Sequence, residues 1–163
     1  MLNEPSPLHR VGHGIRRILL ATDLSRASEA ASAQALELAY GLGAELLIVS
    51  VIDAAAGPPG DLRVLRPDQR RTAREAAAQA LVVRGRTLGV RATFLVWSGE
   101  PGPSIVDAAG SEQPDLVIVG SHGRGLVGRF VLGSVSDHVV RHAPCPVLVV
   151  RARSLGTRVS GAA

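Results

Sequence analysis

The chain has 163 residues, of which 46% are hydrophobic and 20% are charged, a composition typical of a globular protein. We expect one domain, because a second domain would leave too little chain for two cores. All 18 basic residues are arginine and the formal net charge is +4; without lysine, a lysine nucleophile and the lysine of a GxxxxGK[ST] phosphate loop are excluded. A single cysteine, Cys145, excludes an intramolecular disulfide, a zinc site with two or four cysteine ligands and a cysteine-ligated iron–sulfur cluster. We expect Cys145 to be a small buried thiol.

The two ends of the chain are predicted to lie outside the folded domain. Residues 1–14 contain prolines and glycines without hydrophobic periodicity and are expected to form a flexible arm. They lack the apolar core of a secretory signal, and no run of 18 apolar residues occurs, so we expect a cytoplasmic protein without a membrane span. Residues 152–163 are small and polar and are expected to form a frayed tail.

The first predicted strand is the apolar run Ile18–Ala21, whose continuous apolar character is typical of a strand buried on both faces. A helix should follow, with Ser25 as its N-cap and apolar residues at helical spacing as far as Leu42. Gly43 favours a stop there.

The rest of the chain continues to alternate between apolar strands and amphipathic helices. These elements are expected at strand Leu46–Ile52, a loop over 53–66, helix Pro67–Leu88, strand Val90–Trp97, helix Pro101–Glu112 broken or weakened at Gly110, strand Leu116–Val119, helix Ser134–His142 and strand Pro146–Arg151. Such alternation predicts a single-domain α/β fold, an open parallel five-stranded sheet with helices on both faces.

Residues suited to ligand binding follow two of these strands, and in open α/β sheets ligands bind at the carboxyl ends of strands. Asp23 follows the first strand. Gly120 and Gly123 open a glycine-rich loop after the fourth, where backbone can approach a ligand closely. Gly133 then precedes a helix whose first turn, Ser134–Ser136, offers free N–H groups and two hydroxyls. This pattern favours phosphate binding.

The glycine-rich loop has other interpretations. Arg124 and Arg129 would add charge-assisted bonds to a phosphate. The alternative is a surface loop before a helix on which Ser134 and Asp137 form an arrangement like a capping box. A GxGxxG run spans 123–128, but no helix opens directly after it and no acid follows about 20 residues on, so a dinucleotide fingerprint is not favoured.

The spacing of Gly120, Gly123, Gly133 and Ser134 resembles the G-2x-G-9x-G-(S/T) pattern of the universal stress protein family. Further segments are similar to that family: Ile18–Asp23, Leu47–Ile52, Asp115–Gly123, Gly133–Ser136 and Ala143–Val150. The resemblance covers residues 15–151, which we take as the nucleotide-binding domain.

This resemblance implies a flavodoxin-like, Rossmann-like sheet with strand order 3-2-1-4-5 and membership of the ATP-binding subgroup, with Mg²⁺ accompanying ATP by charge. Adenosine would lie between the first strand's end and the backbone of Val51, and the phosphates near Gly133. The implied site comprises Ala21, Thr22, Asp23, Val51, Val119, Gly120, Ser121, His122, Gly123, Arg124, Gly133, Ser134, Val135 and Ser136. For Asp23, capping of the following helix is the alternative role.

Catalysis is not favoured, because no nucleophile–base–orienter arrangement stands out. His122 is expected to pack in the loop and not to act as a base. His138 and His142 share a helix face but lack an obvious third metal ligand, and are expected to interact with the helix dipole. The sequence therefore favours a nucleotide-binding regulatory module of the stress response. A slow ATPase and a nucleotide-independent interaction scaffold are the alternatives.

The sequence bears on two kinds of macromolecular partner. The pI of about 10.8 suggests nucleic acid, but the few aromatic residues are too dispersed for a base-stacking platform, so nucleic-acid binding is not favoured.

In the order 3-2-1-4-5, strand Pro146–Arg151 is an apolar edge, which is a liability unless it is paired. The family pairs this strand across a two-fold axis, so the resemblance implies a homodimer. A regulatory protein partner is expected but not identified.

Overall fold

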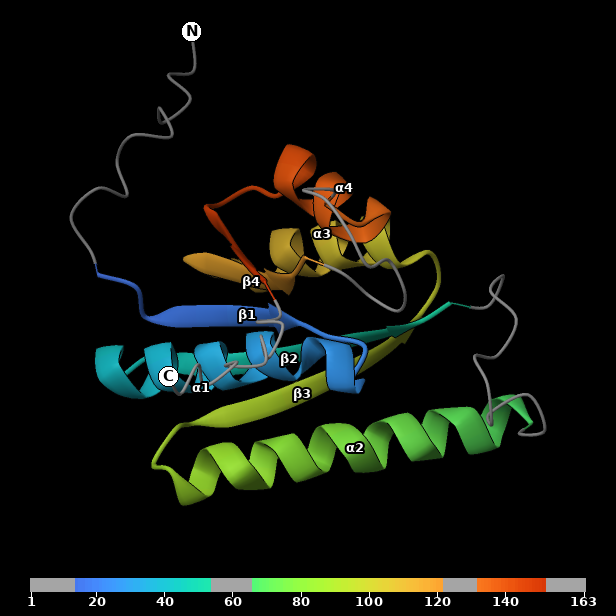
Figure 1. Cartoon of the computed structure of the whole chain (residues 1–163), viewed down its shortest axis with the longest axis horizontal. Coiled ribbons are helices and arrows are strands. Elements are labelled where there is room, and N and C mark those ends of the chain that lie inside the picture. The colour runs from blue at the N-terminus through green and yellow to red at the C-terminus, as the bar shows by residue number, and fades with distance from the viewer. Residues whose placement is uncertain (1–13, 54–65, 122–131, 152–163) are drawn as a thin grey trace, which may run out of the picture.

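The computed structural model describes residues 14–53, 66–121 and 132–151. Five strands form one parallel sheet in the order β3-β2-β1-β4-β5, which confirms the predicted fold and strand order (Figure 1). The strands are β1 (Arg17–Ala21), β2 (Glu45–Ile52), β3 (Ala92–Ser98), β4 (Leu116–Gly120) and β5 (Val147–Val150). The order reverses between β1 and β4, in the middle of the sheet.

Helices cover both faces of the sheet, as predicted. They are the short 3₁₀ turn η2 (Arg26–Ser28) and the helices α1 (Glu29–Leu42), α2 (Pro67–Thr87), α3 (Pro101–Glu112) and α4 (Ser134–His142). Figure 1 shows α1 and α2 on one face and α3 with α4 on the other. Among the described residues, no helix is long and apolar enough to cross a membrane.

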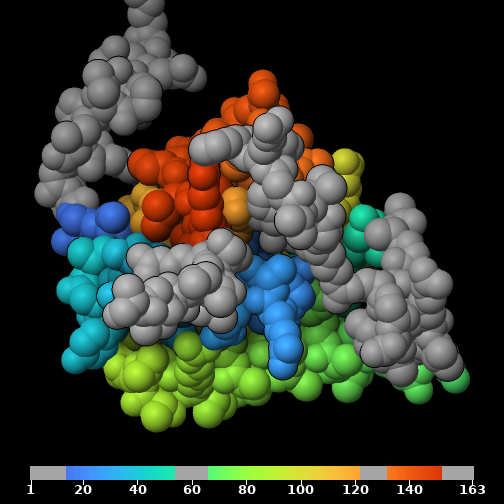
Figure 2. All heavy atoms as spheres, in the orientation of Figure 1, coloured from blue at the N-terminus to red at the C-terminus, as the bar shows by residue number. Residues whose placement is uncertain are grey.

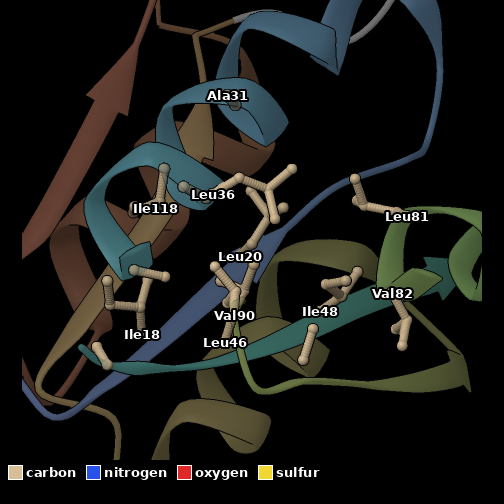
Figure 3. Packing of buried hydrophobic residues seen from close by; sticks show 14 residues of the cluster. Ile18, Leu20, Ala31, Leu36, Leu46, Ile48, Leu81, Val82, Val90 and Ile118 are labelled. Atoms are coloured by element: carbon tan, nitrogen blue, oxygen red, sulfur yellow. The ribbon is translucent and has the colours of Figure 1, made fainter. Parts of the chain in front are cut away.

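The core consists of two apolar layers, because successive strand residues point to opposite faces. Leu20, Ile48 and Ile118 are fully buried in the layer under α1 and α2, which Figure 3 shows. Their neighbours Leu19 and Val49 are buried in the other layer, under α3 and α4. Burial on both faces explains why these strands are continuously apolar in sequence.

Glycines end two helices where the sequence predicted a stop. Gly43 has φ 63° and Gly89 has φ 86°, a left-handed backbone that glycine adopts without steric cost. The strand predicted from Val90 begins instead at Ala92, because the Val90 N–H donates to the Gly85 carbonyl at 2.9 Å and so closes the end of α2.

Three further expectations about the bounds or continuity of these elements are wrong. The helix expected after Ser25 begins at Glu29, because residues 26–28 form a 3₁₀ turn and Ser25 makes no side-chain cap. Helix α3 runs unbroken through Gly110, since Ala108 and Ala109, the two residues just before it, are buried in the core. The last strand begins one residue late, although the Pro146 carbonyl still accepts the Val117 N–H at 3.0 Å.

Candidate functional site

The predicted site residues that the structure describes meet at the carboxyl edge of the sheet, at the point where strand order reverses. In the register, Ala21 is level with Val49 on β2 and with Val119 on β4. Asp23, Val51 and Ser121 each follow two residues later: Val51 is still within β2, and Asp23 and Ser121 lie just beyond the ends of β1 and β4. Ligands of open α/β folds bind at such a switch point.

Helix α4 is fixed by hydrogen bonds to the end of β4. The Gly133 N–H donates to the Ser121 carbonyl at 2.9 Å, and the Ser136 hydroxyl donates to the Gly120 carbonyl at 2.6 Å. Both Ser121 and Ser136 are buried. These bonds bring the two glycine positions together, although a glycine-rich loop separates them in sequence.

The amino end of α4 presents backbone donors. Gly133 is its N-cap, with no side-chain cap, and the first helical bond runs from the Asp137 N–H to the Gly133 carbonyl at 2.9 Å. The N–H groups of Ser134, Val135 and Ser136 therefore have no acceptor within their own helix. Free N–H groups and the positive end of the helix dipole together suit an anion.

Two expectations about this helix are corrected by its contacts. The Ser136 hydroxyl was expected to donate to phosphate, but its single proton is used on the Gly120 carbonyl, which leaves the Ser136 N–H for a ligand. The alternative arrangement of Ser134 with Asp137 as a capping box does not form. The Asp137 carboxylate instead accepts from Arg141 at 2.8 Å, one turn further along.

A network of hydroxyls holds the turn after β1. Thr22 Oγ1 accepts the Leu24 N–H at 3.0 Å and donates to Ser28 Oγ at 2.9 Å. The Ser28 hydroxyl donates in turn to the Ser25 carbonyl at 2.8 Å. Within this turn Leu24 has φ 59°, which a non-glycine residue adopts only when its surroundings hold it there.

Asp23 lies in this turn and is held by its backbone neighbours. Its Oδ1 accepts the Ser25 N–H at 2.9 Å. Asp23 therefore supports the turn before the 3₁₀ segment and does not cap α1, whose N-cap is Ser28. Because an ionised carboxylate has about four acceptor positions, it can still accept hydrogen bonds from ribose hydroxyls or an amino group.

Hydrogen bonds keep Asp23 ionised despite its partial burial. Burial raises the pKa of the carboxyl, but the side chain and N–H of Ser25, the Ser28 hydroxyl and the charge of Arg74 lower it, and the net shift of the pKa is downward from 3.8. The Ser25 N–H makes the direct hydrogen bond to the Asp23 carboxylate. The buried Ser25 Oγ makes no hydrogen bond of standard geometry within the described residues. The site thus holds a negative acceptor at neutral pH.

A lowered carboxyl pKa predicts a loss of stability in acid. Because the folded-state pKa of Asp23 lies below the value of 3.8 for an unperturbed carboxyl, its contribution is present above about pH 4 and is lost as the pH falls through the folded-state pKa. We expect Asp23→Asn to reduce the fall in unfolding free energy between pH 5 and pH 3, a range that spans the ordinary carboxyl value of 3.8, measured by urea denaturation. Glu37→Gln removes one negative charge from the exposed side of α1 and is the matched control.

The end of β2 lies beside this turn. The Thr22 N–H donates to the Val49 carbonyl at 3.0 Å, and Val51, whose backbone groups face the same side as those of Val49, extends beyond the end of β1. This position fits the expected role of the Val51 backbone. Sequence reasoning missed two neighbours, Ser50 and Arg74, which are hydrogen-bonded to each other at 3.1 Å.

Other candidate residues contribute less to this edge. His122, Gly123 and Arg124 lie outside the described residues. The His138 and His142 rings stack with centroids 4.3 Å apart, and in the parts of the chain that the structure describes no group of three or more His, Cys, Asp or Glu side chains could hold a metal ion. Cys145 is half-buried beside the core layer under α3 and α4, so the expected full burial is only partly met.

Known proteins resemble this chain over most of its length. A family model described as the universal stress protein family matches residues 14–151. The chain is 37% identical over 138 residues to a universal stress protein in the QAH/OAS sulfhydrylase 3' region of Thermus aquaticus, and the match covers 83% of this chain and 98% of that protein.

Solved structures share the fold. The universal stress protein UspA from Lactobacillus plantarum is 27% identical with a TM-score of 0.70, and the match covers 86% of this chain and all (100%) of that one. A universal stress protein family protein from Arabidopsis thaliana, solved with AMP bound, is 20% identical with a TM-score of 0.63, over 89% of this chain and 97% of that one.

Proposed function

Because this chain belongs to the universal stress protein family, we propose that it is a regulatory module that binds an adenine nucleotide, ATP, at the carboxyl edge of its sheet. One observation carries the proposal: the amino end of α4, docked on Gly120 and Ser121, lies at the same edge as the ionised Asp23. A donor-rich helix end suits phosphates, and a carboxylate acceptor suits the hydroxyls and amino group of adenosine. The Arabidopsis relative solved with AMP supports the choice of an adenine nucleotide.

In this proposal the two halves of the ligand bind to different elements. The phosphates lie against the N–H groups of Ser134, Val135 and Ser136, where Gly133 lets them approach the backbone closely. Adenosine lies between the β1–α1 turn with Asp23 and the end of β2 with Val51. Mg²⁺ accompanies the nucleotide because the triphosphate carries a high negative charge, and the protein acts in the cytoplasm.

Nucleotide content of the purified protein tests the proposal. We expect denatured, freshly purified protein to release about one ATP per chain, identified by mass spectrometry. We expect Gly133→Ala to weaken ATP binding by about tenfold or more, because a Cβ holds the phosphates away from the N–H groups of the helix end. At φ −61° the Gly133 backbone accommodates alanine, so a loss of binding reports the space beside the helix end and not misfolding.

Gly110→Ala is the matched control. A Cβ there meets nothing within 4 Å, so this variant is expected to bind ATP like the wild type. If the wild type releases no nucleotide and binds none at millimolar ATP with Mg²⁺, the site assignment is wrong and an interaction scaffold becomes the working function. Release of ADP, with sustained phosphate release that Gly133→Ala abolishes, would identify a slow ATPase.

We further propose that the protein acts as a homodimer through β5. Its four residues, all valine or leucine, are only half-buried, and β4 is the one strand paired with β5 within the described residues. The carboxyl-terminal part of the described chain, which includes β5, reaches the surface in Figure 2. An apolar sheet edge that is free on one side is stabilised by pairing with a second copy.

A further inference from the structure

We infer that Arg74 of α2 is a positioning residue for the adenosine half of this site. It holds that half in place by joining the β1–α1 turn to the end of β2. The inference rests on the proposed nucleotide function. One guanidinium nitrogen, Nη1, donates both to the backbone carbonyl of Asp23 and to the Ser50 hydroxyl, the latter at 3.1 Å. Arg74 therefore bonds directly to Asp23, one of the two proposed adenosine residues. It also bonds to Ser50, which precedes the other one, Val51.

The partners of Arg74 are unusual for a core position. Ser50 is 0% exposed and is the one polar residue of β2 on the face covered by α1 and α2, where Leu46 and Ile48 precede it. A buried hydroxyl needs a hydrogen-bond partner, and Arg74 provides it. A pair of apolar residues would fill the same space without burying a charge, so packing alone does not account for the arrangement.

The geometry separates the adenosine half of the site from its phosphate half. Arg74 approaches from the α1 and α2 side and reaches the ends of β1 and β2. The phosphate half is built differently, by the bonds from Gly133 and Ser136 to the end of β4. Loss of Arg74 should therefore widen or loosen the space between Asp23 and Val51 while the amino end of α4 keeps its place.

The turn that Arg74 holds is one that would relax without support. Leu24, next to Asp23, has φ 59°, a conformation that costs a leucine energy and persists only when the surroundings hold it. The Thr22 and Ser28 hydroxyls hold it from within the turn, and Arg74 is the contact from α2, 51 residues away in sequence. Removing that contact leaves the Asp23 carbonyl without its bond to α2, and among the described residues the turn then keeps its own hydroxyl bonds and the Thr22 N–H bond to Val49.

Three ligands separate the two halves of the site in a binding experiment. ATP, adenosine and inorganic tripolyphosphate are titrated by calorimetry into wild type, Arg74→Met and Arg71→Met. Methionine keeps much of the aliphatic stem and removes the donors. Arg71 is the matched control, because it lies one turn earlier on α2 and donates to the Val96 carbonyl of β3 at 3.1 Å, which is a bond to neither proposed adenosine residue.

We expect Arg74→Met to weaken adenosine and ATP by about tenfold, as expected for losing hydrogen bonds from a charged donor, and to change tripolyphosphate binding by less than about twofold. Arg71→Met should leave all three within about twofold. Equal weakening of adenosine and tripolyphosphate by Arg74→Met would overturn the inference, because it would mark general support of the fold. So would identical behaviour of the two variants.

Failure of the proposed function has a different signature: the wild type then binds neither ATP nor adenosine, and the role of Arg74 is overturned with it. If Arg74→Met does not fold, which circular dichroism will reveal, Ser50→Ala takes its place. That smaller change removes one of the two acceptors of Nη1. It is expected to weaken adenosine but not tripolyphosphate, and unchanged adenosine binding in Ser50→Ala would contradict the inference.

Discussion

Replacing Leu20 by alanine is expected to lower the free energy of unfolding by about 3–5 kcal/mol, the upper range for deleting a large side chain from a well-packed core. Leu20 lies on the central strand, is 0% exposed, and is level with Ile48 on one side and Ile118 on the other. All three side chains belong to the layer under α1 and α2 (Figure 3), so the cavity is enclosed on all sides and cannot collapse easily.

Urea denaturation of wild type and variant measures this effect as a shift in midpoint at constant slope. Leu42→Ala is the matched control: the same atoms are removed, but from a side chain that is 50% exposed at the end of α1, and the expected loss is below about 0.5–1 kcal/mol. Domains of this kind are stable by only about 5–15 kcal/mol, so the Leu20 variant should lose a large part of the total. Equal losses in the two variants would contradict the assignment of the core.

The fold could be predicted because its determinants are local in sequence. Four-residue runs such as Ile18–Ala21 and Leu116–Val119 have no polar position, which is typical of strands buried on both faces, and Gly43 and Gly89 mark helix ends by a backbone that other residues avoid. The errors were at boundaries where two local preferences compete. At Ser25 the hydroxyl could cap a helix, but the turn closes first as a 3₁₀ segment.

The strand ends that form the site could be predicted for the same reason, because the residues that surround them are adjacent in sequence to apolar strands. How those residues contact each other could not. From the sequence, the Ser136 hydroxyl is expected to donate to a phosphate. In the structure it donates to the Gly120 carbonyl, because α4 packs against the end of β4. Asp115 is a further case: its Oδ2 accepts the N–H groups of Arg16 and Arg17, 99 and 98 residues away. No periodicity in the sequence reports such contacts.

Arg74 shows the limit most clearly. In sequence it is one of several arginines on the polar face of an amphipathic helix, where a solvated side chain is the usual outcome. Its partners Ser50 and Asp23 are 24 and 51 residues away. A serine at the end of the apolar run Leu46–Val49 was the available signal, because a hydroxyl at a buried strand position requires a partner from another element.

Replacing Val149 by proline is expected to convert the proposed dimer, of twice 16.9 kDa, to a monomer. The Pro146 and Val150 carbonyls accept N–H groups of Val117 and Ser121, so alternate residues of β5 point their backbone groups toward β4. The N–H of Val149 therefore faces the open edge. Proline removes that donor and blocks pairing there, while the ladder with β4 keeps its bonds.

Light scattering over a range of protein concentrations measures the mass directly. Val149→Thr is the matched control, because threonine has nearly the same shape and keeps the N–H, so the dimer should persist. A proline variant that remains dimeric would place the interface elsewhere, and a wild type that is monomeric at every concentration would remove the dimer from the proposed function. The proposed nucleotide site lies at the carboxyl edge of the sheet and not along β5, so we expect the monomeric variant still to bind ATP, and that binding would also show that the variant is folded.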